Sequence, residues 1–147
     1  EAVGLSRTLA RLMRHTPWAE RLLEQADRLI PMPLAASRLK ERGFNQALEL
    51  ARHLEPTQVD TSCLQRIDTT EHQVGADRAQ RLSQVQNSFL LTPLAMGSLA
   101  GQRVVLIDDV MTTGATLDVA ARCVLAAGAS QVHVAVFART PSDRTYT

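Results

Sequence analysis

Apolar residues along the chain recur at two spacings, one typical of buried strands and one typical of helices. The clearest run is Val104-Val105-Leu106-Ile107, four branched apolar residues in succession, which predicts a buried strand. After a short polar turn, apolar residues recur at helical spacing from Leu117 to Leu125. The pattern therefore predicts a buried strand that leads into a helix, with the polar turn between them.

The rest of the chain predicts further elements of the same two kinds. The expected helices are 5–14, 17–26 and 44–54. The expected strands are 28–34, 59–67, 89–94 and 131–137. Helical spacing turns two sets of apolar side chains inward: Leu5, Leu9, Leu12 and Met13 on the first helix, and Phe44, Ala47, Leu48 and Ala51 on the third. Residues 35–43 and 95–101 are expected as loops. Alternating strands and helices predict an α/β fold with a mostly parallel sheet flanked by helices.

Composition limits the class of protein. The 147 residues carry a formal net charge of +1, with 45% hydrophobic and 21% charged residues, which is ordinary for one globular domain. We expect a single domain over residues 1–147, with N-terminal helices in residues 1–26. The charge argues against binding nucleic acid over the whole surface and leaves room for a local basic patch. No apolar run has membrane-spanning length, and Cys63 and Cys123 lack metal-ligand spacing, so we expect a cytoplasmic protein without membrane insertion.

Two carboxylates, Asp108 and Asp109, follow the buried run where its strand is expected to end. The next segment, Thr112 to Thr116, is a turn rich in hydroxyl groups with Gly114 at its centre. The helix that follows offers backbone N–H groups without intrahelical partners, which favour phosphate. Carboxylates repel phosphate but accept hydrogen bonds from the vicinal hydroxyl groups of a sugar. The arrangement therefore predicts a site for a ribose 5-phosphate.

Each part of this pattern also has a purely structural explanation. An acidic pair after a strand is often the solvated start of a loop, and threonines before a helix often serve only as N-caps. The run as a whole, with strand, acidic pair and Thr-Thr-Gly-Ala-Thr turn in succession, favours the functional interpretation. Two other phosphate motifs are excluded, because the chain has no Gly-Lys-Ser/Thr of a Walker loop and no G-x-G-x-x-G after a strand.

The segment from Val104 to Leu117 resembles the signature of type I phosphoribosyltransferases, which bind phosphoribosyl pyrophosphate (PRPP). The segment from Pro31 to Gln46 narrows the resemblance to the ComF/GntX branch, the competence-associated phosphoribosyltransferase-like proteins. A third set has the spacing found in that branch: Arg66, Thr70, Gln73, Arg81 and Phe89. Gln84 departs from it, since the branch usually has Asn there. ComF-like proteins often carry a cysteine-rich zinc module ahead of the transferase domain, and no Cys precedes Cys63 here.

The resemblance implies a type I phosphoribosyltransferase-like fold and a role for each motif. The 5′-phosphate of PRPP is expected at Thr112, Thr113, Gly114, Ala115 and Thr116. The basic loop is expected to hold the pyrophosphate, with Arg42 as its main contact because a planar fork suits phosphate oxygens, and with Arg38 and Lys40 beside it. Residues 68–88 are expected to form a flexible hood over PRPP, with Arg66, Gln73 and Arg81 in or near it. Mg²⁺ is expected to be bound mainly through PRPP oxygens and water, with no protein ligand of its own.

Two functions from different classes remain open. In the first, the protein transfers ribose 5-phosphate from PRPP to an unidentified acceptor, with Asp108 and Asp109 orienting the ribose and Arg42 stabilising the leaving pyrophosphate. In the second, it is a non-catalytic module that senses PRPP or a nucleotide, or that contacts single-stranded DNA or DNA-uptake proteins. Aromatic residues make up 3% of the chain, which weakens a direct DNA role. Intact phosphate-loop residues argue against a mere scaffold, and an oligomer stays open.

Overall fold

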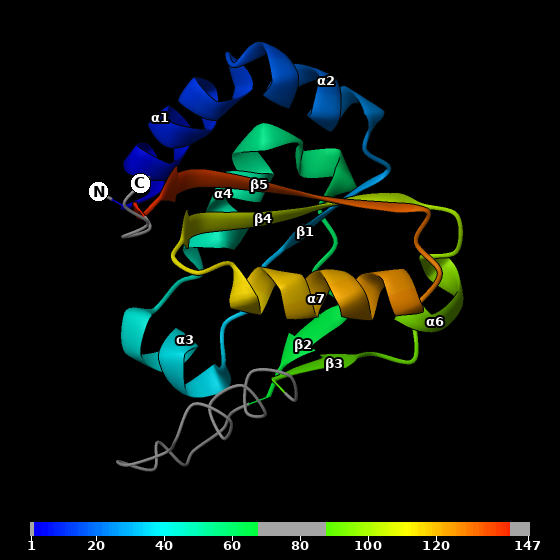
Figure 1. Ribbon diagram of the computed structural model, residues 1–147. Helices are drawn as coiled ribbons and strands as arrows, with labels where there is room; N and C mark the ends of the chain where they lie inside the picture. Colours follow the sequence, from blue (N-terminus) through cyan, green and yellow to red (C-terminus); the bar gives the residue numbers. More distant parts are fainter. Residues whose placement is uncertain (1, 68–87, 142–147) are drawn as a thin grey trace, which may run out of the picture.

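The computed structural model describes residues 2–67 and 88–141 (Figure 1). Its helices are α1 (Ala2–Arg14), α2 (Pro17–Gln25), α3 (Ala36–Arg42), α4 (Gln46–Leu54), α6 (Ala95–Ser98) and α7 (Ala115–Ala126), with one 3-10 turn, η1 (Pro56–Gln58). Its strands are β1 (Arg28–Pro31), β2 (Leu64–Arg66), β3 (Phe89–Leu91), β4 (Arg103–Met111) and β5 (Gln131–Arg139).

Three of the strands form a parallel sheet in the order β1-β4-β5. Figure 1 shows α1, α2 and α4 on one side of this sheet, and α7 with the β2–β3 pair on the other. This arrangement confirms the predicted α/β architecture, a mostly parallel sheet flanked by helices. In the described residues, no helix is long and apolar enough to cross a membrane.

The run Val104 to Ile107 lies at the centre of the core, as predicted. Its residues are all buried, and they alternate between two hydrophobic clusters. Val104 and Leu106 pack on the side of α7, whereas Val105 and Ile107 pack on the side of α1, α2 and α4. A strand buried on both faces needs an uninterrupted apolar sequence, which is why this segment could be identified without a structure.

The expected strand 59–67 is broken, and this prediction was wrong in its length. Only β2 forms there, and it pairs antiparallel with β3 in a separate two-stranded sheet. Val59 makes a single parallel bridge to Leu29 in β1. Between them the Asp60 carboxylate accepts a hydrogen bond from the backbone N–H of Ser62 at 2.8 Å, a local turn that competes with strand pairing. The two-stranded sheet consequently stands apart from the main one.

The inward faces of two helices also differ from the predicted ones. On α1, Met13 is buried as predicted, but Ser6 and Ala10 are buried beside it, whereas Leu5 and Leu12 are exposed. Ala10 shares a cluster with Ala51 of α4, and small side chains at a helix crossing let the two backbones approach closely, which displaces the leucines to one flank. On α4, Ala47 and Ala51 are buried as predicted, but Leu50 and Leu54 are buried in place of Phe44 and Leu48.

Candidate functional site

Asp108 and Asp109 lie inside β4 rather than after it. β4 continues to Met111, and Asp108 pairs in register with Val136 of β5. The prediction that the strand ends before the acidic pair was therefore wrong, because β5 is long enough to keep β4 extended for four further residues, Asp108 to Met111. The pair is partly buried rather than fully solvated.

Both carboxylates are oriented by the backbone that follows them. The N–H of Asp109 donates to Oδ1 of Asp108 at 2.9 Å, and the N–H of Val110 donates to Oδ1 of Asp109 at 2.9 Å. Each bond uses one carboxylate oxygen, and the two carboxyl groups also contact each other, which raises the pKa of Asp108. Two fixed acceptors side by side suit a pair of vicinal hydroxyl groups.

The electrostatic environment of Asp108 connects three elements of the fold. Burial is the largest of the causes that raise the pKa of Asp108 to about 7, and the neighbouring Asp109 carboxyl acts in the same direction. The backbone N–H of Asp109 and the Arg66 guanidinium on β2 oppose them. Burial also disfavours the charged form of Arg66 and so lowers its pKa. The positive charge of Arg38 on α3 lowers this pKa further, and the negative charge of Asp108 raises it. The Arg66 guanidinium also stacks over the Phe89 ring, 5.5 Å from its centroid. The structure thus brings Arg66 within electrostatic reach of both Arg38 and Asp108.

The turn between β4 and α7 has the geometry of an anion cradle. Thr112 and Thr113 are exposed, and Gly114 has φ 79°, a left-handed conformation that favours glycine. The N–H of Ala115 donates to Oγ1 of Thr113 at 3.3 Å, and the N–H of Asp118 makes the first helical bond, to the Gly114 carbonyl at 2.9 Å. The first-turn N–H groups of Thr116 and Leu117 precede that bond and have no partner within the helix. The predicted turn and helix start are both present.

The predicted basic loop is a helix. Residues Ala36–Arg42 form α3, which ends at Gly43 in a left-handed conformation with φ 78°. The loop prediction was wrong because the sequence Ala-Ser-Arg-Leu-Lys-Glu-Arg consists mostly of good helix formers followed by a glycine stop. No residue of α3 is buried, so Arg38, Lys40 and Arg42 are all exposed. Of these three, Arg38 is the one whose charge acts on Arg66.

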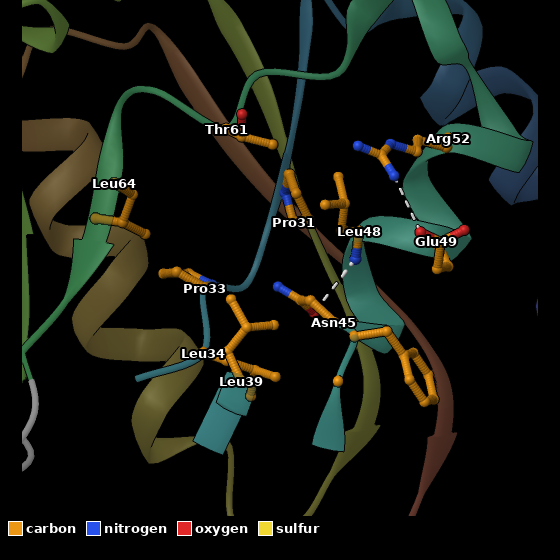
Figure 2. A pocket seen from close by; sticks show the side chains of 12 residues that line it. Pro31, Pro33, Leu34, Leu39, Asn45, Leu48, Glu49, Arg52, Thr61 and Leu64 are labelled. Carbon is orange, nitrogen blue, oxygen red and sulfur yellow. Dashed lines mark hydrogen bonds and ion pairs between the residues drawn. The ribbon is translucent and has the colours of Figure 1, made fainter. Parts of the chain in front are cut away.

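A pocket of about 380 Å³ lies behind α3, between the end of β1 and the start of α4 (Figure 2). Its walls are mostly apolar, and Figure 2 shows Leu34, Leu39 and Leu48 directed into it. Phe44 and Leu48 line this pocket, which explains why they are only partly buried. The pocket does not include the carboxylate pair, and it leaves the α3 side of the site loosely supported.

Asn45 is a positioning residue that the sequence analysis missed. Its Oδ1 accepts hydrogen bonds from the N–H groups of Ala47 and Leu48 at 3.0 and 3.4 Å, and its Nδ2 donates to the Met32 carbonyl at 3.1 Å. It therefore caps α4 and ties it to the chain just beyond β1. The preference of asparagine for N-cap positions was the available signal.

Some predicted site residues lie outside the described part of the chain. They are Thr70, Gln73 and Arg81, and nearly all of the expected hood, residues 68–88, lies there too. Arg66 and Phe89 stand on β2 and β3, at the two ends of that segment. Within residues 2–67 and 88–141, no group of three or more His, Cys, Asp or Glu side chains is arranged to hold a metal ion.

Comparison with known proteins gives the class of this protein. Residues 39–145 match the family model of the phosphoribosyl transferase domain. The fold resembles purine phosphoribosyltransferase from Pyrococcus horikoshii, with a TM-score of 0.54, 21% identity, and coverage of 96% of this chain and 77% of that one. It also resembles hypoxanthine phosphoribosyl transferase from Trypanosoma cruzi, with a TM-score of 0.56, 14% identity, and coverage of 95% and 76%.

Three relatives narrow the class. Competence protein ComFC of Bacillus subtilis is 40% identical over 68% of this chain and 39% of its own length. Competence protein F of Haemophilus influenzae is 30% identical over 92% of this chain and 61% of its own length. DNA utilization protein YhgH of Escherichia coli O157:H7 is 33% identical over 80% and 52%. The chain therefore belongs to the phosphoribosyl transferase domain family and, within it, to the ComF-like type I proteins, although it spans only 39–61% of these relatives' length.

Proposed function

We propose that this protein binds PRPP at the carboxyl edge of β1 and β4 and transfers its phosphoribosyl group to an acceptor that the structure does not identify. The observation that carries the proposal is the succession of a fixed carboxylate pair, a left-handed glycine turn and a helix N-terminus at one edge of a parallel sheet. Ligands of open α/β sheets bind at this edge. The α7 start suits the 5′-phosphate, and the carboxylate pair suits the ribose hydroxyl groups.

The basic residues suit the other end of PRPP. In transfer, the bond between C1 of the ribose and pyrophosphate breaks, pyrophosphate leaves with the electron pair, and the acceptor forms a bond to C1. The charges of Arg38 and Arg66 act on each other, and together they would stabilise the leaving pyrophosphate. Lys40 and Arg42, on the same exposed helix as Arg38, would add to this. The protein's contribution is then position and electrostatics, without a covalent intermediate on a side chain.

Magnesium fits this arrangement as an ion carried by PRPP. The site has two carboxylates and no larger cluster of ligands among the described residues, which suits a cation that keeps water and ligand oxygens around it. When bound, Mg²⁺ would supply additional charge neutralisation at the pyrophosphate. Two free thiols agree with a reducing compartment such as the cytoplasm.

A second function belongs to the binding class. Relatives named as competence and DNA utilization proteins favour a part in DNA uptake or use, in which PRPP or a nucleotide is sensed rather than consumed. The partners would then be other uptake proteins or single-stranded DNA. Both functions require the same PRPP site, so binding has to be tested before turnover.

Calorimetry with PRPP, with and without Mg²⁺, tests binding. Asp108→Asn and Asp109→Asn should each weaken PRPP about tenfold or more, because a hydrogen bond to a charged partner contributes about 1.5–3 kcal/mol. Their affinity for inorganic phosphate should hold or improve, whereas Thr113→Val should weaken both ligands. Asp118→Asn is the matched control, since Asp118 lies in the first turn of α7 and pairs with Arg122. Unchanged PRPP affinity in both Asn variants would contradict the proposed site.

A screen for released pyrophosphate then separates the two functions. The free protein is incubated with PRPP, Mg²⁺ and a panel of bases and amines. Pyrophosphate release that depends on one acceptor class and is lost in Asp109→Asn supports transfer. PRPP binding without release for any acceptor supports the sensing module.

A further inference from the structure

The outer edge of β5 is the longest unpaired strand edge in the described chain. β5 has nine residues and pairs only with β4 among the described strands. Its outward N–H and C=O groups form a template for another strand, which monomeric proteins usually block with lysine, proline or a bulge. β5 contains neither lysine nor proline, and its pairing with β4 runs in register from Gln131↔Arg103 to Arg139↔Met111. Nothing in the strand itself therefore blocks further pairing.

Exposed apolar side chains flank this edge on both faces of the sheet. Val132 and Val136 pack against the α7-side core, and Val134 beside them is 37% exposed. Ala135 packs in the α1–α2–α4 cluster, and Phe137, two residues on, is 39% exposed. Above them, Trp18 on α2 is 63% exposed and lines a groove with Arg21 and His133. An exposed apolar border along an open strand edge is typical of a protein interface.

We propose that β5 is the contact between two copies of this chain, paired antiparallel about a two-fold axis at Ala135. The outward-pointing N–H and C=O groups of the two edges can bond to each other only if the two-fold axis passes beside a residue, so that this residue faces its own copy. If all nine residues pair, that residue is Ala135, the centre of the strand. The register then places Val134 opposite Val136 of the partner copy, and Gln131 opposite Arg139. No like charges face each other, so the edge is complementary to itself.

The helices above the sheet add a second complementary contact. Figure 1 shows α2 above the beginning of β5 and α1 above its end, so an antiparallel pair sets α2 of one copy beside α1 of the other. Leu5 and Leu12 lie seven residues apart on one flank of α1, opposite Arg14, which bonds to the end of α4. The exposed Trp18 of one copy would thus meet the exposed leucine flank of the other.

The dimensions suit a small specific dimer. A nine-residue edge is about 31 Å long, and the sheet with a helix layer on each side is about 20 Å thick, so each copy would bury about 600 Å². Two copies would bury about 1,200 Å², the lower end of the range for stable specific interfaces. The pairing would join two three-stranded sheets into one of six strands, with both PRPP sites at edges that the contact leaves open.

Sedimentation equilibrium of the chain over a wide concentration range tests the dimer. The parent should form a dimer, and Val134→Lys and Phe137→Lys should each weaken it at least tenfold, because a charge enters the apolar border. Leu94→Lys is the matched control, since Leu94 is 73% exposed in the turn before α6, and it should leave the dimer intact. A monomeric parent, or a dimer that persists in both β5 variants, overturns the proposal.

Spin labels on the otherwise unchanged edge test the register without disturbing the apolar border. With Cys123→Ala, and Cys63 buried, single labels are placed at Gln131→Cys or Arg139→Cys. A two-fold axis at Ala135 makes the two inter-copy distances equal, at about 27 Å each for eight residues of strand. A shift of the axis by one residue makes them differ by about 14 Å and overturns the register. Slow amide exchange along β5 in a monomer would show that another segment covers the edge, which overturns the dimer.

Discussion

The two arms of the candidate site differ in how firmly they are packed into the core. The β4–α7 arm, which carries the carboxylate pair and the phosphate turn, belongs to the core: β4 is buried in both clusters, and α7 buries Leu117, Ala120 and Val124. The β1–α3 arm carries the basic residues, and α3 buries no side chain at all. The first arm can hold charges in fixed positions, whereas the second can adjust to whatever it contacts.

This difference matters for a reaction that depends on position and electrostatics. The carboxylates of Asp108 and Asp109 are each held by a backbone N–H, so they are oriented before a ligand arrives. By contrast, α3 is stopped by Gly43 and borders the pocket of Figure 2 instead of packed side chains. We infer that the β4–α7 arm, which we propose binds the ribose, is preorganised, and that the β1–α3 arm, which we propose binds the pyrophosphate, adjusts to its ligand.

The largest expected effect concerns packing. Leu117→Ala on α7 should reduce the free energy of unfolding by about 2–5 kcal/mol, because it opens a cavity in the core. Leu39→Ala on α3 should change it by less than about 0.5 kcal/mol, since Leu39 borders solvent and the pocket. Urea titration followed by circular dichroism measures both. Similar losses in the two variants would mean that α3 is as firmly packed as α7, and the comparison would break.

The difference in packing between the two arms also explains which elements could be predicted from the sequence. Three features of the β4–α7 arm were recognised, and each has one physical cause. The apolar run of β4 follows from complete burial, the glycine turn from a positive φ, and the periodicity of α7 from a stripe that faces the core. The helix α3 was missed because a short, exposed and charged segment has no repeating apolar positions from which a helix can be recognised. Only its helix propensity and Gly43 indicated a helix. Prolines and basic residues made the segment look like a loop.

The site showed the same division. Asp108 and Asp109 were singled out as candidates because they follow a buried run, but the length of β4 was not predicted, because it depends on how far β5 extends beside it. The approach of Arg38 to Arg66 depends on how α3 and β2 meet in space, which no spacing in the sequence records. Local elements such as the buried run and the glycine turn could be predicted from the sequence, whereas contacts between distant segments required the fold.

The next effect concerns the β4–α7 arm and is the pH dependence of the free energy of unfolding. The pKa of Asp108 rises from 3.8 to about 7 on folding, mainly through burial. Between these values the unfolded chain is ionised at this position while the folded protein keeps its proton, so the free energy of unfolding should fall as the pH rises from about 4 to 7. Asp108→Asn should remove this dependence and stabilise the fold at pH 8 by on the order of 1 kcal/mol, a modest value because the carboxyl is partly solvated.

Urea titrations at a series of pH values between 4 and 8 measure this dependence. Asp109→Asn is the informative companion, since it removes one of the causes that raise the pKa of Asp108 and should bring the upper end of the pH window down. A parent protein whose stability is flat from pH 4 to 7 would show that Asp108 stays well hydrated in the fold.

The smallest effect concerns the β1–α3 arm, here called the adaptable arm, and shows which of two arginines contributes more to binding pyrophosphate. The sequence favoured Arg42 as the main pyrophosphate contact, whereas in the structure Arg38 is the α3 residue whose charge acts on Arg66, and Arg66 in turn acts on Asp108. Arg38→Ala should therefore weaken binding of magnesium pyrophosphate by about threefold to fivefold, an ordinary value for an exposed charge, and Arg42→Ala by less than about twofold. Calorimetry at low and high salt measures both, and the loss at Arg38 should shrink as salt screens the charge. Because α3 buries no side chain, neither variant should change the free energy of unfolding, so a change in affinity reports on binding alone. An equal or larger loss at Arg42 would mean that α3 moves on binding far enough to exchange one arginine for the other, which would make the adaptable arm more mobile than the contrast with α7 implies.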